Sequence, residues 1–150
     1  MSELHIFKKN WGGRGELPPG PWRQEGNLYR LHCGPHPCLI KRSYVGVLCG
    51  YVGLRPGHPL FGVDRGFNGF DDLPEVHGGW TLAALNQGLD EIVDDKGLWW
   101  FGFDCAHAMD LVPVWVEIGL NYGEYRTVEY VRAELERVSA EFEVADDRSR

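Results

Sequence analysis

Between residues 127 and 142, apolar side chains recur at intervals of three and four positions. This spacing is typical of a helix that buries one face. The positions concerned are Val128, Val131, Leu135, Val138 and Phe142. Thr127 is suited to cap the N-terminus, and Glu129 lies where the helix dipole favours a negative charge. We therefore predict one long C-terminal helix over 127–142, followed by a tail, 144–150, that frays.

The chain before this helix has the pattern of strands and turns. Residues 27–33 and 38–54 are rich in β-branched and aromatic side chains, and the turn sequence GPHP lies between them. Residues 76–85 predict a further strand. The run LWWFGFD at 98–104 is aromatic and uncharged until its last residue, which indicates a central strand buried on both faces.

Glycine and proline dominate two other segments. Residues 1–26 contain WGGRGELPPGPW, which leaves little room for regular structure and predicts an N-terminal arm. Residues 55–75 form a long connection that includes aromatic side chains, and such loops in a compact domain are usually functional. We predict an α+β fold: a single domain over 27–150, built from an antiparallel or mixed sheet with the long C-terminal helix packed on it.

The balance of charges limits the partners. Asp and Glu number 22 against 15 Lys and Arg, a net charge of −7. Such a chain is unsuited to duplex nucleic acid, whose affinity comes from many phosphate contacts. A small anion needs only a few arginines. Four that could meet a phosphate are Arg55, Arg65, Arg126 and Arg132. We expect a small-molecule ligand and leave open a homo-oligomer.

No segment has the pattern of a signal peptide or a membrane span. The N-terminal MSELHIFKKNWGG has no apolar core, and no later run of about 18 apolar residues is present. We expect a cytoplasmic protein with no membrane partner. The cysteines that should then stay reduced are Cys33, Cys38, Cys49 and Cys105.

Histidine and aspartate gather directly after the aromatic run. Asp104, His107 and Asp110 are spaced three apart, which would place them on one side of a helical turn at the end of the strand. His77 has a similar setting in VHGGWT, where the two following glycines permit a ligand to approach the backbone.

Two kinds of chemistry fit these residues. His77 and His107 could act as general acid and base, with Asp104 or Asp110 orienting one imidazole; our leading assignment is Asp104. Alternatively, the same three residues and Asp110 could bind a divalent metal. We prefer acid–base catalysis and assign no metal ligand and no cofactor. A cysteine that follows an aromatic strand is more often buried than nucleophilic, so Cys105 is not given a role.

A second histidine cluster has a weaker pattern. HCGPHPC brings His32, Cys33, His36 and Cys38 close together. A structural zinc site normally draws on a second pair of ligands elsewhere in the chain, so we interpret this stretch as a hairpin turn.

Strand alternation separates the aromatic residues of the run at 98–104. Trp99, Phe101 and Phe103 should face one side, and Trp100 and Gly102 the other. Because Gly102 leaves a gap, we assign Trp100 to a ligand pocket and the other three aromatic residues to the core. The full set assigned to ligand binding is Trp100, His58, Arg55, Arg132 and Asp110.

Four stretches resemble a family of small proteins of tailed phages and prophages. They are GYVGLRPGHPLFG, VHGGWT, WWFGFDCAHAMD and YRTVEYVRAELERVSAEF, within a region of similarity that runs from about residue 38 to 142. The resemblance implies a setting but carries over no catalytic residue. In that setting, small acidic proteins often counter host defences by binding or destroying nucleotide signals.

Our leading hypothesis is a pocket protein that acts on a small nucleotide or related phosphoester by histidine acid–base chemistry. An aromatic face could stack the base, and nearby arginines could hold the phosphate. The alternatives are a binding module that sequesters a nucleotide without turnover, and a metal-dependent hydrolase.

Overall fold

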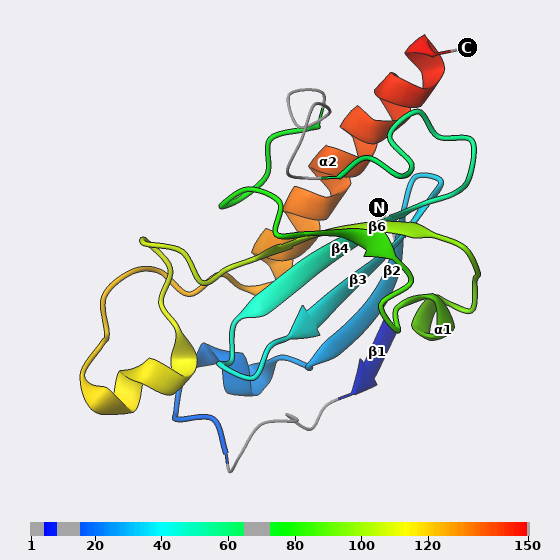
Figure 1. Cartoon of the computed structure of the whole chain (residues 1–150). Helices are drawn as coiled ribbons and strands as arrows, with labels where there is room; N and C mark the ends of the chain where they lie inside the picture. Colours follow the sequence, from blue (N-terminus) through cyan, green and yellow to red (C-terminus); the bar gives the residue numbers. More distant parts are fainter. Residues whose placement is uncertain (1–4, 9–15, 65–72, 150) are drawn as a thin grey trace.

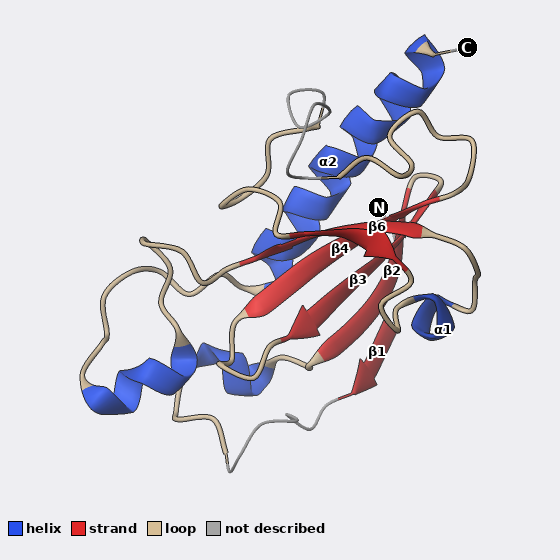
Figure 2. Ribbon diagram, in the orientation of Figure 1, coloured by secondary structure: helices blue, strands red, loops and turns tan. Residues whose placement is uncertain are grey.

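The computed structural model describes residues 5–8, 16–64 and 73–149, and it has the predicted α+β fold. Six strands form one antiparallel sheet in the order β1-β2-β3-β4-β6-β5 (Figure 1). The strands are β1 (His5–Lys8), β2 (Leu28–Cys33), β3 (His36–Arg42), β4 (Leu48–Leu54), β5 (Leu82–Leu85) and β6 (Trp99–Asp104). The helices are α1 (Asp90–Val93) and α2 (Val128–Arg148), with 3-10 helices η1 (Pro21–Gln24) and η3 (Pro113–Ile118) (Figure 2).

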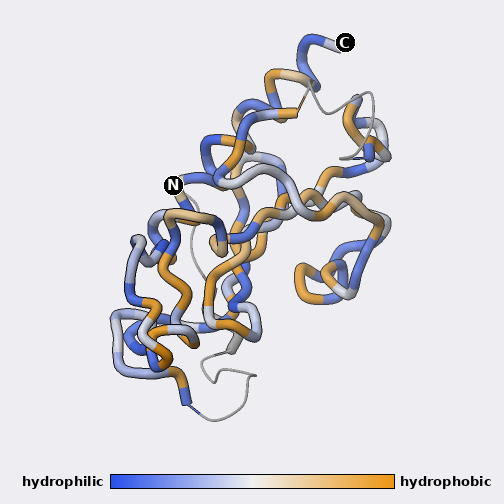
Figure 3. Tube along the Cα trace, turned by 60° about the vertical axis from the view of Figure 1, so that its left-hand side comes forward, coloured by the Kyte–Doolittle hydropathy of each residue, from blue (hydrophilic) through white to orange (hydrophobic). Residues whose placement is uncertain are grey.

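Side chains alternate between the two faces of the sheet, and each face carries a buried hydrophobic cluster. One face packs against α2, and this cluster includes Leu31, Ile40, Val52, Phe101 and Phe103 from the sheet with Val131, Leu135, Val138 and Phe142 from the helix. The other face packs against residues in and around α1, and this cluster contains Leu39, Leu98, Trp100, Leu89 and Val93. Hydrophilic positions interrupt the hydrophobic ones along α2, in keeping with its single buried face (Figure 3).

Helix α2 begins as predicted but extends further. The Thr127 hydroxyl accepts a hydrogen bond from the Tyr130 backbone N–H at 3.1 Å, which is the expected N-cap. The helix continues to Arg148 instead of ending at Phe142, so the prediction of a fraying tail from residue 144 is wrong. No Gly or Pro interrupts this stretch, and Ala145 packs against the core.

The predicted N-terminal arm contributes regular structure to the same fold. Strand β1 pairs with β2 at the edge of the sheet. Leu17 and Trp22 are buried, and the indole N–H of Trp22 donates to the carbonyl of Pro18 at 2.6 Å. Outside β1 and η1, the described residues of this segment have no regular structure. The sequence alone could not predict β1, because its pairing with β2 depends on contacts distant in sequence.

Strand β6 lies between β4 and β5, and the alternation predicted for it is confirmed. Phe101 and Phe103 face α2, whereas Trp100 faces the α1 side. Trp100 is fully buried, and Tyr51 occupies the space beside Gly102: a Cβ atom there would lie 2.8 Å from its ring. The predicted gap is absent, so the assignment of Trp100 to a ligand pocket is wrong.

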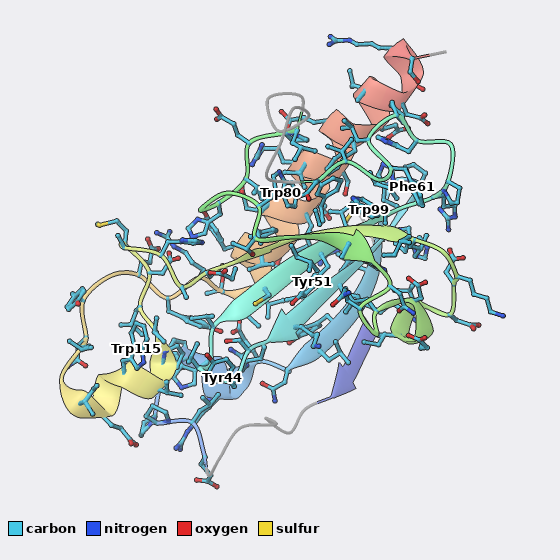
Figure 4. All side chains as sticks on the ribbon, viewed as in Figure 1. Tyr44, Tyr51, Phe61, Trp80, Trp99 and Trp115 are labelled. Atoms are coloured by element: carbon cyan, nitrogen blue, oxygen red, sulfur yellow. The ribbon has the colours of Figure 1, made fainter. Side chains whose placement is uncertain are left out.

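The strand predicted over 76–85 is shorter than expected, since β5 begins at Leu82. The residues before it form a loop that carries His77, and Trp80 from this loop packs into the core on the α2 side (Figure 4). Of the helices that the structure describes, none is long and apolar enough to cross a membrane.

Candidate functional site

His77 is the centre of a hydrogen-bonded cluster that joins three segments of the chain. Its Nε2 lies 2.8 Å from Oδ2 of Asp110, in the turn after β6. Its Nδ1 lies 2.7 Å from the hydroxyl oxygen of Tyr130, in the first turn of α2. The backbone N–H of His77 donates to Oε2 of Glu134 at 2.9 Å. These polar contacts fix the loop that carries His77, the turn that carries Asp110 and the first turns of α2 relative to one another.

Asp110 is the anionic end of this cluster. Its side chain is fully buried and accepts from Arg126 Nε at 2.7 Å and from the His107 backbone N–H at 3.0 Å. Burial alone would raise the pKa of Asp110, but the hydrogen bonds from His77 and Arg126 outweigh burial and hold that pKa below its usual range. Asp110 is therefore a carboxylate at neutral pH, and His77 donates to it from Nε2.

The second histidine lies beside the first and has its own carboxylate. The rings of His77 and His107 are 6.0 Å apart, centroid to centroid, in an edge-to-face arrangement. His107 Nε2 is 3.2 Å from Oδ1 of Asp104, but without the angles of a hydrogen bond. The side chain of His107 is 35% exposed against 12% for His77, although its Nε2 atom is buried against Gly78.

Gly78 makes this close approach of the two loops possible. Its φ of +70° lies in the left-handed region, and a Cβ atom there would lie 2.0 Å from Cδ2 of His107. Only glycine fits both conditions. The group that approaches the backbone at Gly78 is the His107 side chain, and the approach of a ligand to this glycine pair stays a prediction.

Of the two aspartates, Asp110 is the one that orients an imidazole, through its hydrogen bond to His77. Asp104 lies beside His107 and accepts the backbone N–H of Ala106 at 3.0 Å. The expected helical turn is absent: residues after β6 form an irregular turn that folds Asp110 back beneath His77. The predicted catalytic residues His77, His107 and Asp104 are nevertheless all brought together.

Most residues assigned to ligand binding lie elsewhere. Arg55 and His58 line a separate hollow of about 460 Å³ with His36 and Asp146. His58 Nε2 is 2.8 Å from the carbonyl of Phe142, and the 1.5 Å rise per residue of a helix places that carbonyl about 18 Å from Tyr130 along α2.

The other predicted arginines have different settings. Arg132 pairs with Glu136 at 3.4 Å on α2, and Arg65 lies outside the described residues. Arg126 contacts the His77 cluster through its hydrogen bond to Asp110.

A metal centre has no support in the geometry of the described chain. Across residues 5–8, 16–64 and 73–149, no three His, Cys, Asp or Glu side chains are grouped so that they could hold a metal ion. Cys33 and Cys38 are buried beneath α2. Cys105 is also buried, and burial, followed by the charge of Asp110, raises the pKa of its thiol far above the usual range. This thiol is therefore unsuited to nucleophilic attack.

The sequence reasoning missed Tyr130 and Glu134, and gave Arg126 no contact with the histidines. The Arg126 guanidinium carbon lies 5.0 Å from the centroid of the Tyr130 ring, within the range of a cation–π contact. These residues are far from His77 in sequence and on a helix whose pattern is explained by its buried face. No local signal distinguishes them.

No protein-family model, curated protein or solved structure matches this chain. The similarity to a phage protein family stays a prediction.

Proposed function

We propose that the His77 and His107 cluster acts on a small phosphoester such as a nucleotide, with the two histidines as its acid–base pair. The observation that carries the proposal is that two imidazoles lie 6.0 Å apart and each has its own carboxylate. Paired imidazoles can move protons to and from the reacting oxygens of a phosphoester. Arg126 adds a positive charge beside them.

The two histidines have different surroundings and so different roles. His77 is oriented by the buried Asp110 carboxylate, as the base is oriented in a nucleophile–base–carboxylate triad. His107 is more exposed and is the group that delivers a proton to the departing oxygen. In a phage setting, the substrate would be a nucleotide signal in the cytoplasm of the host cell.

One observation favours a second function, sequestration without turnover. Both ring nitrogens of His77 are engaged by protein groups, Tyr130 and Asp110. An imidazole held in this way can serve to shape a binding site without transferring a proton. The same cluster would then bind the phosphate group and release it unchanged.

Incubation of the protein with a molar excess of nucleoside mono-, di-, tri- and cyclic phosphates, followed by chromatography, separates these functions. An enzyme depletes a nucleotide with time, and His107→Gln should slow this by about 10²- to 10⁴-fold, the usual worth of a proton-transfer group. His32→Gln is the matched control, because His32 is exposed on β2. Nucleotide that is bound but recovered intact after heat denaturation would establish sequestration. Turnover abolished by a chelator would favour a metal-dependent hydrolase.

A further inference from the structure

Three side chains form a chain of hydrogen bonds that leads from the protein interior toward its surface. Asp110 is fully buried, His77 is nearly so, and Tyr130 is half-buried. Because Asp110 is ionised, it accepts a hydrogen bond from the Nε2–H of His77. In the neutral tautomer that carries this proton, Nδ1 is an acceptor, and the Tyr130 hydroxyl, 2.7 Å away, is its donor.

This order of groups is that of an activated nucleophile: a buried carboxylate, an imidazole that it orients, and a hydroxyl within hydrogen-bond reach of that imidazole. We infer that Tyr130 is the nucleophile of the site and that its oxygen forms a covalent bond to phosphorus. The inference rests on the proposed phosphoester chemistry and names the atom that attacks.

The surroundings of Tyr130 make a base necessary. Burial, followed by the negative charge of Glu134, raises the pKa of the Tyr130 phenol. The phenol is therefore protonated at neutral pH, and His77 is placed to remove its proton during attack. Arg126 lies against the face of the Tyr130 ring, so a positive charge is adjacent to the attacking group.

The reaction balances in two steps. First, Tyr130 Oη bonds to phosphorus and the bond from phosphorus to the leaving oxygen breaks, while the phenol proton passes to His77 Nδ1 and the His107 imidazolium protonates the leaving oxygen. Second, water attacks phosphorus and the bond to Tyr130 breaks. The water proton passes to His107, and the Tyr130 oxygen regains its proton from His77.

The fixed end of α2 keeps the nucleophile in place. Tyr130 lies in the first turn, where its backbone N–H is held by the N-cap Thr127. Its ring contacts that of His77 edge to face, with centroids 5.2 Å apart. The loop that carries the base, His77, is tied to the same helix through Glu134. Nucleophile and base are therefore held in position relative to each other before substrate binds.

Bis(p-nitrophenyl) phosphate is a suitable probe, because its leaving group needs no acid. Wild-type protein should release p-nitrophenolate and, on acid quench, carry an acid-stable phosphoryl adduct on the peptide that contains Tyr130. Tyr130→Phe keeps the ring but should lose the adduct. Its turnover should fall by at least about 99%, which is the 10²-fold lower end of the rate loss expected when a catalytic group is removed. Tyr44→Phe, on an exposed side chain, is the matched control.

A second variant separates the two steps. In His107→Gln the first step survives with this leaving group, but the base for the second step is gone, so the adduct should accumulate to about one per chain. Full turnover by Tyr130→Phe, or an acid-labile adduct on a histidine, would overturn the role of Tyr130 and leave the proposed function standing. Absence of turnover by wild-type protein on both this probe and the nucleotides would overturn the proposed function itself.

Discussion

Replacement of Trp100 by Phe tests the position that the structure gives to this residue. The indole is packed among Leu39, Leu89 and Leu98, and its N–H donates to Oδ1 of Asp90 at 2.8 Å. Asp90 is only 5% exposed, and its other oxygen accepts the backbone N–H of Gly97 at 2.9 Å. The substitution keeps an aromatic ring but leaves one buried carboxylate oxygen without its donor.

Two costs can be estimated for Trp100→Phe. Loss of a hydrogen bond to a charged group costs about 1.5 to 3 kcal/mol. The smaller ring also leaves a cavity, which adds about 1 kcal/mol. We expect the free energy of unfolding to fall by about 2.5 to 4 kcal/mol, a large part of the roughly 5 to 15 kcal/mol typical of a domain. The same substitution of a tryptophan that lined an open pocket would lower the free energy of unfolding far less.

Urea denaturation, followed by circular dichroism, measures this loss. Trp115→Phe is the control, because Trp115 is 43% exposed on η3, away from the sheet (Figure 4), and should cost less than about 0.5 kcal/mol. In a double-mutant cycle with Asp90→Ala, the two substitutions should together cost about 1 to 2 kcal/mol less than their sum, since each removes the same bond. A Trp100→Phe loss no larger than the control, or strictly additive costs, would refute the reasoning.

Three further substitutions probe buried polar groups. Burial, followed by the charge of nearby His58, lowers the pKa of His36 from 6.5 to about 4. His36 should therefore leave the free energy of unfolding unchanged above pH 6.5. Its protonation should lower that free energy by up to about 3 kcal/mol as the pH drops toward 4. The free energies of unfolding of wild-type protein and His36→Gln, measured by urea denaturation, should converge as the pH falls. If both free energies changed with pH at the same rate, this role of His36 would be contradicted. Arg42 is fully buried and hydrogen-bonds four groups, so Arg42→Lys should cost about 2 to 4 kcal/mol in the same assay; a loss below about 1 kcal/mol would count against it. Asp110→Asn should lower the midpoint of thermal unfolding through loss of about 3 kcal/mol, because Arg126 loses its buried partner; an unchanged midpoint would argue against a buried charge pair.

The sequence predicted those parts of the fold that depend on local periodicity. The spacing of Val131, Leu135 and Val138 identified the buried face of α2, and alternation in the 98–104 run placed Phe101 opposite Trp100. It could not predict what covers each face. Trp100 is covered by α1, whose few residues have no helical periodicity to detect, and β1 becomes a strand only through its pairing with β2.

The same limit applies to the candidate site. His77 and His107 could be identified because their residue types and glycine or aromatic neighbours are visible in a short window. Their partners could not be identified in this way. A spacing of three predicted a helical turn where the chain forms an irregular one, and the hydrogen bond between Asp110 and His77 joins residues that are far apart in sequence. Tyr130 joins the cluster from a distant helix, so only the packing of α2 on the sheet reveals it.

The position of Tyr130 depends in turn on the segment that the sequence analysis treated as a separate arm. Oε2 of Glu25 accepts the backbone N–H of Val128 at 2.7 Å, and its Oε1 lies 3.5 Å from Arg42. A carboxylate at this end of α2 satisfies a backbone donor that the helix itself leaves unpaired and opposes the positive end of its dipole. The buried Arg42 fixes that carboxylate to β3. A domain boundary at residue 26 would therefore remove the group that anchors the first turn of α2, and with it the helix end that carries Tyr130 to His77.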